Sequence, residues 1–185
     1  MVLGTSDVMR IVAGEAKGRR LRAPSGRDTR PTADRVREEL FSNLGEISGL
    51  AVLDLFAGSG ALGIEALSRG AARAVFVDDD RRAVATVRSN LDATGFAASV
   101  VRSDALRYLD RAAREGVRFD LILLDPPYDA APRIAAALAD RLPEVISENS
   151  RIVTESDKRS PLRLDLPLAL ERVYGDTRIA VHRAP

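Results

Sequence analysis

One stretch of the sequence, residues 119–128, constrains the fold more than any other. It reads FDLILLDPPY, an apolar run with one acid inside it that stops at Asp125 and two prolines. A continuous apolar run of this kind is typical of a strand buried on both faces, as in the middle of a parallel sheet. Pro126 and Pro127 lack the N–H that a strand ladder needs, so the strand must end there. Asp125, two stiff carbonyl groups and the ring of Tyr128 are therefore predicted at the carboxyl end of a central strand, where open α/β sheets place their ligands.

This group of atoms suits a planar molecule that carries an exocyclic NH2 group. Asp125 and a carbonyl near Pro126 can accept its two N–H groups, and Tyr128 can stack on its ring. Accepting both hydrogens stabilises the positive charge that forms when the nitrogen attacks an electrophile, and nucleobases carry such an amine. The alternative is a structural strand end, an Asx-type turn beside an aromatic plug. The predicted catalytic residues are Asp125, Pro126, Pro127 and Tyr128.

Buried strands alternate with amphipathic helices from Leu50 onward. Strands are predicted at 51–55, 74–78, 99–102, 119–124 and 151–155, and helices at about 61–69, 81–94, 105–115 and 130–142. Such alternation means right-handed βαβ crossovers and an α/β fold with a doubly wound, mostly parallel sheet. Two further segments, 168–174 and 177–182, flank a Gly-Asp turn and predict a closing antiparallel hairpin.

The composition fits one compact domain with a small extension. The chain has 185 residues, of which 45% are hydrophobic and 30% charged, enough to bury a sizeable core. It has no cysteine and a single histidine, His182, which excludes disulfides and Cys/His nucleophilic pairs and argues against the usual zinc sites. No run approaches the roughly 18 apolar residues of a membrane span, and no signal-peptide pattern opens the chain. We expect a cytoplasmic monomer that binds neither a membrane nor a metal.

Positive charge is concentrated near the N-terminus. Residues 10–37 hold nine Lys and Arg residues against three acids, a net charge of +6, whereas the whole chain carries +1 and the remainder therefore −5. Within this region, segments 10–14 and 18–23 flank a Gly-bounded turn and predict a basic β-hairpin. A helix over about 33–45 follows, with Thr32 as its cap.

These cations suit a polyanionic partner. A basic hairpin can hold the phosphate groups of a nucleic acid. Arg residues at the start of a helix oppose its macrodipole, which favours a binding role over a stabilising one. The predicted substrate-binding residues are Lys17, Arg19, Arg20, Arg22, Arg30, Arg35 and Arg37. The alternative is a solvated basic edge strand that prevents aggregation.

A glycine-rich turn follows the first predicted strand. Residues 58–63 spell G-x-G-x-x-G, which usually places a dinucleotide pyrophosphate on a helix N-terminus. Asp54, near the end of that strand, would repel a pyrophosphate and attract an ammonium group. Asp78 and Asp104, after the next two strands, are placed for ribose hydroxyls and an adenine amino group, although each lone acid is also typical of a turn or cap. Together these features indicate S-adenosylmethionine. The predicted cofactor-binding residues are Asp54, Phe56, Gly58, Ser59, Gly60, Asp78, Asp104 and Ala105.

With these motifs in place, the chain resembles the class I methyltransferases. Over about residues 10–183 it is similar to the RsmD family, bacterial enzymes that methylate N2 of a guanine in 16S ribosomal RNA. The resemblance is carried by RIVAG and KGRRL within 10–21, RPTADRVREELF at 30–41, DLFAGSG at 54–60 and DLILLDPPY at 120–128. It implies a seven-stranded sheet of order 3-2-1-4-5-7-6, a small-ribosomal-subunit substrate and no metal. Family members often have Glu at the position of Asp78.

We therefore expect residues 1–30 to form a basic hairpin extension and linker, and residues 31–185 to form an S-adenosylmethionine-dependent methyltransferase domain acting on 16S rRNA. Three alternatives stay open. An adenine-N6 DNA methyltransferase shares the D-P-P-Y chemistry, and a nicotinamide-dependent oxidoreductase would use the glycine-rich turn. A non-enzymatic RNA-binding assembly factor would need only the basic extension.

Overall fold

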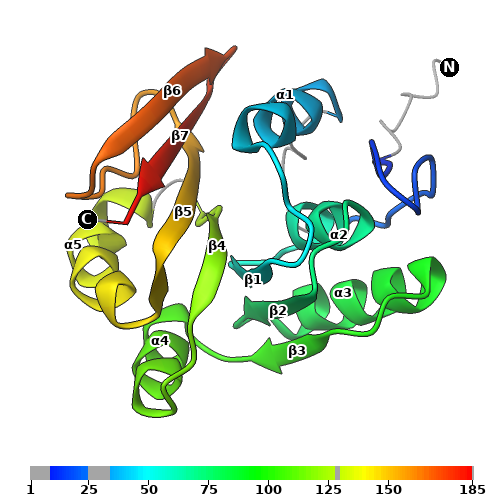
Figure 1. The fold of residues 1–185 in the computed structure, drawn as a ribbon, viewed down its shortest axis with the longest axis horizontal. Coiled ribbons are helices and arrows are strands. Elements are labelled where there is room, and N and C mark those ends of the chain that lie inside the picture. Colours follow the sequence, from blue (N-terminus) through cyan, green and yellow to red (C-terminus); the bar gives the residue numbers. More distant parts are fainter. Residues whose placement is uncertain (1–8, 25–33, 128–129, 185) are drawn as a thin grey trace, which may run out of the picture.

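The chain folds into one mixed β-sheet with helices packed on both faces (Figure 1). It is described from a computed structural model, in which residues 9–24, 34–127 and 130–184 are placed. The strands are β1 Ala51–Leu55, β2 Arg73–Asp78, β3 Ser99–Arg102, β4 Phe119–Leu124, β5 Ile146–Asp157, β6 Leu168–Tyr174 and β7 Thr177–Arg183. The helices are α1 Asp34–Leu44, α2 Ala61–Ser68, α3 Arg81–Thr94, α4 Ala105–Arg114 and α5 Ala131–Arg141, followed by a 3-10 turn at Leu142–Glu144.

The strand order is β3-β2-β1-β4-β5-β7-β6, which confirms the predicted α/β topology. Strands β1 to β5 pair in parallel, whereas β7 runs antiparallel to both β5 and β6. The predicted closing hairpin of β6 and β7 is therefore confirmed. Because the parallel strands all point the same way, the ends of β1, β2, β3 and β4 meet at one edge of the sheet.

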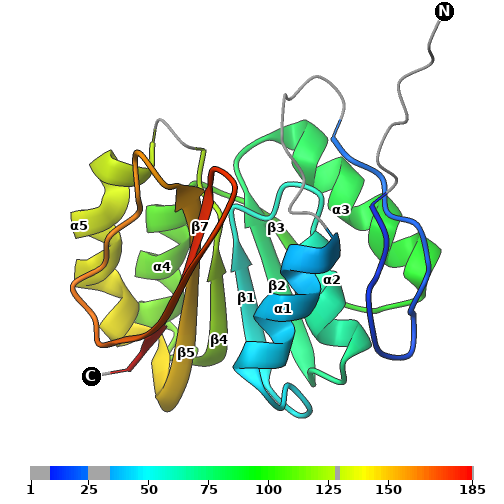
Figure 2. The same cartoon turned by 90° about the horizontal axis from the view of Figure 1, so that it is seen from above.

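Two hydrophobic cores lie on the two faces of the sheet, and Figure 2 shows α1, α2 and α3 on one side and α4 and α5 on the other. The first core includes Leu40 and Phe41 of α1, Ile64 of α2, Leu91 of α3, Val52 of β1 and Leu123 of β4. The second includes Leu109 of α4, Leu138 of α5, Leu53 of β1 and Ile122 of β4. Successive strand residues thus alternate between the cores, and this alternation decides which polar side chains face α1.

The N-terminal segment differs from its prediction. Instead of two continuous strands, residues 9–24 form a loop closed by a single antiparallel bridge between Arg10 and Arg20. Further backbone bonds join Ile11 N–H to the Arg19 carbonyl at 3.0 Å and Leu21 N–H to the Met9 carbonyl at 2.8 Å. The hairpin prediction was right about the pairing and wrong about its length, because the turn bends away to bond with α2 instead of continuing the ladder.

The strand β5 begins five residues earlier than predicted. Its pairing with β4 is irregular between Phe119 and Leu121, and Ser150 fills the irregularity, since its hydroxyl lies 2.7 Å from the Phe119 carbonyl. Because the residues at the start of β5 are mostly polar, the apolar pattern did not predict a strand there. No helix within the placed segments is long and apolar enough to cross a membrane.

Candidate active site

Acidic side chains gather where β1, β2 and β4 end. In the ladder, Asp54 of β1 lies beside Phe76 of β2 and Leu123 of β4. Phe76 and Leu123 belong to the core beneath α1 and α2. Asp125 follows Leu123 by two residues, so strand alternation directs it to the same face as Asp54. The structure thus brings the predicted cofactor acid and the predicted catalytic acid to one edge and one face of the sheet.

Asp54 is held in a position where a charge is costly. Its side chain is only 2% exposed, and it accepts a hydrogen bond from the Gly63 N–H at 2.9 Å. Burial raises the pKa of Asp54 to about 7, although the Gly63 hydrogen bond opposes the rise and the nearby charge of Asp78 adds to it. An acid in this state gains most from a cationic partner such as an ammonium group.

Only glycine fits at position 63. A Cβ there would lie 2.4 Å from the ring of Phe76 and 2.9 Å from a carboxylate oxygen of Asp54. The last glycine of the G-x-G-x-x-G pattern therefore allows α2 to approach β1 and β2 closely enough for its backbone to bond with Asp54.

Asp78 organises the glycine-rich turn. One of its carboxylate oxygens accepts the Gly58 N–H at 2.9 Å, and the other accepts the Asp80 N–H at 2.9 Å. Within the same turn Phe56 has φ 73°, the only non-glycine residue of the placed segments with positive φ. Such a conformation is strained for an aromatic residue and is found mostly at functional sites. The sequence motif includes Phe56 but does not reveal this strain.

Asp104 caps a helix and also lies where the adenine contact was predicted. Its exposed carboxylate caps α4 by accepting the Arg107 N–H at 3.0 Å. The end of β3 is joined to the end of β2 by a bond from the Ser103 N–H to the Asp78 carbonyl at 3.1 Å. Asp104 and the buried Ala105 therefore lie at the same edge of the sheet as the other acids, and the adenine contact stays a prediction.

Asp125 is half-buried between β1 and β5, with Pro126 buried and Pro127 exposed after it. Burial raises the pKa of Asp125 well above its usual range, and the negative charges of Glu155 and then Asp54 raise it further. These three acids thus share one environment. Tyr128, the predicted stacking residue, lies outside the described residues.

Glu155, which follows Thr154 in β5, was not among the site residues predicted from the sequence. Thr154 lies beside Leu124 in the ladder, so Glu155 and Asp125 are the next neighbours along the two strands. Its side chain is 3% exposed. In the sequence, Glu155 is recognisable only as an acid that ends a predicted apolar strand. Its position beside Asp125 depends on the register of β4 with β5, which cannot be read from the sequence.

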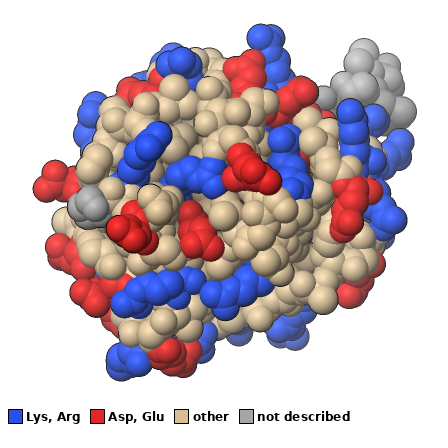
Figure 3. Space-filling model, viewed as in Figure 1, with Lys and Arg blue, Asp and Glu red and all other residues tan. Residues whose placement is uncertain are grey.

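Most of the predicted RNA-binding cations lie on the surface. Lys17, Arg19, Arg20, Arg22 and Arg35 are exposed, and basic side chains gather at the upper right of Figure 3, where the N-terminal loop lies in Figure 1. Arg30 lies outside the placed segments.

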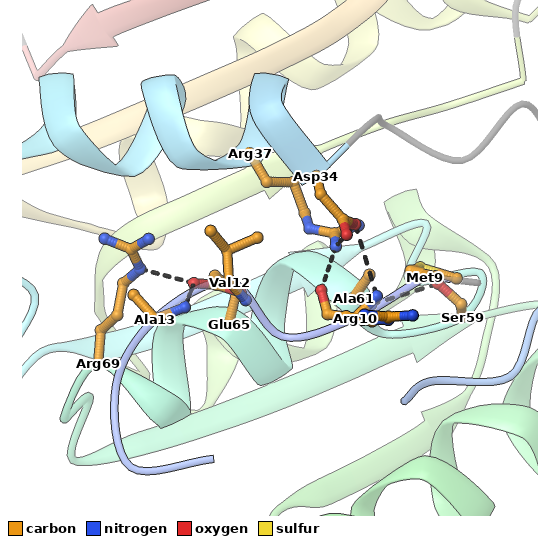
Figure 4. Close-up of polar contacts among 10 residues, drawn as sticks. All are labelled: Met9, Arg10, Val12, Ala13, Asp34, Arg37, Ser59, Ala61, Glu65 and Arg69. Atoms are coloured by element: carbon orange, nitrogen blue, oxygen red, sulfur yellow. Dashed lines mark hydrogen bonds and ion pairs between the residues drawn. The ribbon is translucent and has the colours of Figure 1, made fainter. Parts of the chain in front are cut away.

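The assignment of Arg37 was wrong. Its side chain is fully buried, where it bonds to Asp34 at 2.6 Å and to the carbonyl of Arg10 (Figure 4). Burial lowers the pKa of Arg37, and the charges of Asp34, Glu65 and Glu155 oppose that change. Because α1 packs on the N-terminal loop, this cation joins the two segments and presents no charge to a phosphate.

The N-terminal loop is fixed to α2 by its own backbone. The carboxylate of Glu65 accepts the N–H groups of Val12 at 2.8 Å and Ala13 at 3.0 Å, and also pairs with Arg69 at 2.8 Å (Figure 4). Such bonds use the main chain and leave the loop's cationic side chains on the surface.

The same loop also reaches the glycine-rich turn. The Asn90 amide of α3 donates to the carbonyls of Arg22 at 3.0 Å and Ser59 at 2.8 Å, and its oxygen accepts the Arg22 N–H at 2.9 Å. The predicted RNA-binding loop and the predicted cofactor turn therefore share one anchoring side chain.

Comparisons with known proteins find methyltransferases among the proteins that resemble this chain. A family model described as conserved hypothetical protein 95 matches residues 9–183. The putative rRNA methyltransferase YlbH of Bacillus subtilis is 42% identical over 182 residues, which are 95% of this chain and 98% of that protein. Ribosomal RNA small subunit methyltransferase D of Escherichia coli is 42% identical over 125 residues, 66% of this chain and 62% of that protein. The solved structure of the putative methyltransferase yhhF from Escherichia coli has a TM-score of 0.79 and 34% identity, covering 96% of this chain and 98% of that one.

Proposed function

The chain belongs to the conserved hypothetical protein 95 family, the RsmD family of rRNA methyltransferases, and on that premise we propose that it methylates the N2 amine of a guanine in 16S rRNA of the small ribosomal subunit. The resemblance indicated by the sequence motifs is confirmed, and with it methyl transfer in place of hydride transfer. The guanine N2 position, the small subunit as substrate, a monomeric state and a cytoplasmic location are our predictions.

One observation supports the proposal most: a buried acid suited to a cation and a half-buried acid suited to an amine lie at neighbouring strand ends. Asp54 and Asp125 share a face of the sheet, and the charge of Asp54 contributes to the raised pKa of Asp125. A cationic methyl donor at the first and an aromatic amine at the second would meet between β1 and β4, at the crevice where open α/β sheets bind ligands.

S-adenosylmethionine fits the residues at the ends of β1 and β2. Asp54, with its raised pKa, would hold the ammonium group of the cofactor, and Asp78 would hold ribose hydroxyls beside the turn that it orders. When bound, this cofactor supplies a methyl group on a positively charged sulfur and leaves as a neutral thioether. The remaining contacts are proposed for Phe56, Gly58, Ser59, Gly60, Asp104 and Ala105.

The base is positioned by the strand end itself. Asp125 and the carbonyl of Pro126 would accept the two hydrogens of the amine, and Tyr128 would stack on the ring. The carboxylate of Asp125 would stabilise the positive charge that develops on the amine nitrogen during methyl transfer. The nitrogen then releases a proton, which Asp125 accepts more readily than an ordinary carboxylate because its pKa is raised. Orientation and charge placement supply most of the acceleration.

The rRNA backbone would lie along the N-terminal loop while the target guanine is turned out of its stack, at a cost of a few kcal/mol. The residues proposed for phosphate contacts are Lys17, Arg19, Arg20, Arg22, Arg30 and Arg35. The division into an extension at 1–30 and a methyltransferase domain at 31–185 remains part of the proposal.

The proposal is tested with methyl-labelled S-adenosylmethionine offered with small subunits that lack the modification, with free 16S rRNA and with DNA. The labelled nucleoside is then identified after complete digestion. We expect N2-methylguanosine from 16S rRNA. Labelled N6-methyladenosine from DNA would instead support the adenine-N6 alternative, and the absence of label in every nucleic acid would support the assembly-factor alternative.

A further inference from the structure

A third acid stands beside Asp125 in the site. Because Leu124 pairs with Thr154, Asp125 just after β4 and Glu155 within β5 are side by side, and neighbouring strands are about 4.8 Å apart. Leu123 and Val153, two residues earlier on each strand, both lie in the core beneath α1 and α2. Strand alternation therefore directs both carboxylates to the face where Asp54 lies.

This arrangement is costly for the fold. Glu155 is 3% exposed and Asp125 is half-buried, and two like charges side by side with little access to water destabilise each other. Arg37 is the buried cation that Glu155 helps to keep charged. Arg37 also bonds to Asp34 at 2.6 Å, and the charges of Asp34 and Glu65 support it as well. Glu155 therefore has a structural task toward Arg37, and its position beside Asp125 allows a second task in the site.

The chemistry of guanine supplies a reason for the pair. Its N1–H and its N2 amine are adjacent donors on the Watson–Crick edge, whereas adenine has a lone pair at N1. Two carboxylates on neighbouring strands can accept both donors, and the second would repel an N1 lone pair. Resting on the proposed function, we propose that Glu155 determines base specificity by accepting the N1–H of the target guanine while Asp125 accepts from N2.

The proposal separates guanine from adenine, which the D-P-P-Y sequence alone does not. A site that pairs a base edge with matched acceptors discriminates against a base that lacks one donor by about 10- to 100-fold. The discrimination is expected in the rate of methyl transfer to a base that has the N2 amine and lacks the N1–H.

The test uses a 16S rRNA fragment that the protein methylates, prepared with either guanine or 2-aminopurine at the target position. 2-Aminopurine keeps the exocyclic amine, replaces N1–H by a lone pair and lacks O6, so the contact at N1 is reported by the change of the ratio in the Glu155 variant. We expect the wild-type protein to transfer methyl to guanine about 10- to 100-fold faster. In Glu155→Gln, the amide can donate to that lone pair, so the ratio of the two rates should fall toward one.

Because the two rates are measured on one protein sample, their ratio does not depend on how much of the variant is folded. Thr154→Val is the matched control: Thr154 is buried next to Glu155, and alternation directs it to the opposite face, so its ratio should equal that of the wild type. Thermal unfolding compares the folded state of both variants with that of the wild type.

Three results would overturn the inference: a wild-type protein that methylates 2-aminopurine as fast as guanine, a Glu155→Gln ratio equal to that of the wild type, or a folded Glu155→Gln protein inactive on both bases. The second would leave Glu155 as a counterion of Arg37. Each leaves the proposed function standing, since that function fails only if the wild-type protein places no methyl on guanine N2.

Discussion

The N-terminal loop and the acidic end of the sheet both concentrate charge, and they handle it differently. Lys17, Arg20 and Arg22 keep their charges in water, while the backbone of the loop makes the bonds that fix it to α2 and α3. At the sheet edge Asp54 is buried and Asp125 is half-buried, and burial raises the pKa values of both. The first region is suited to contact a long polyanion, and the second is suited to act on one small group.

Arg35 and Arg37 show the same contrast within a single turn of α1. The side chain of Arg35 is 87% exposed and pairs with Glu39 at 3.1 Å, whereas that of Arg37 is 1% exposed and pairs with Asp34. Identical residue types two positions apart thus belong to the surface and to the interior. Packing decides which of the two arginines is exposed, and only an exposed arginine is available to a binding partner.

The largest expected effect concerns the buried region. Asp125→Asn should reduce methyl transfer by about 100-fold or more, because the variant loses the charge that stabilises the developing positive nitrogen. Its dissociation constant for S-adenosylmethionine, measured by calorimetry, should stay within about threefold of the wild-type value. Asp165→Asn, a change of an exposed acid between β5 and β6, is the matched control and should leave the rate unchanged. Equal losses of cofactor binding and transfer in Asp125→Asn would contradict the separation of roles.

The paired arginines come next. Arg37→Leu should lower the free energy of unfolding by about 3 kcal/mol, because it leaves buried acids without their cation. Arg35→Leu should change it by less than about 1 kcal/mol, as expected for a surface ion pair, while weakening RNA binding. Urea unfolding of both variants measures the difference. Similar unfolding free energies for the two would mean that burial does not distinguish these residues.

A smaller effect is expected from the loop cations. Replacing Lys17 and Arg20 with Ala should weaken RNA binding and reduce the slope of log affinity against log salt by about 1 to 2, since two phosphate contacts are lost. Replacing Arg114 and Arg118, exposed cations at the far end of α4, should alter neither quantity. An unchanged slope in the first variant would assign the loop a structural role only.

The pH dependence of cofactor binding gives the smallest effect. The pKa of Asp54 is raised to about 7 in the fold, so the folded protein binds more protons than the unfolded chain between about pH 4 and 7. Its contribution to stability therefore falls as pH rises through that window. A cationic ligand favours the ionised acid, so affinity for S-adenosylmethionine should increase from pH 6 to 8. In Asp54→Asn that increase should disappear. Calorimetry at several pH values measures the affinity, and an increase that persists in the variant would contradict the role of Asp54.

The sequence identified what depends on neighbouring residues. Strand ends, the glycine-rich turn and the acids Asp54, Asp78 and Asp125 follow from short patterns of apolar residues, glycine and proline. The strand order came from the family resemblance. These features were accessible because each needs only a few residues in sequence.

What the sequence did not identify depends on contacts across the fold. The burial of Arg37 follows from the packing of α1 on the N-terminal loop, and the position of Glu155 follows from the register of β4 with β5. The loop formed one bridge where a hairpin was predicted because Glu65, more than 50 residues away, binds its backbone. Capping by Asp104 shows that an acid at a strand end can have a local task as well.

The central claim is that the methyl donor and the guanine amine meet between Asp54 and Asp125. It is tested most directly by a crystal structure with guanosine and an S-adenosylmethionine analogue in which an amino group replaces the transferable methyl. We predict that N2 of guanine lies about 3–3.5 Å from that group, as a reactive geometry requires, with Asp125 accepting from N2. A base bound away from Asp125, or one that presents another edge to the analogue, would contradict the account.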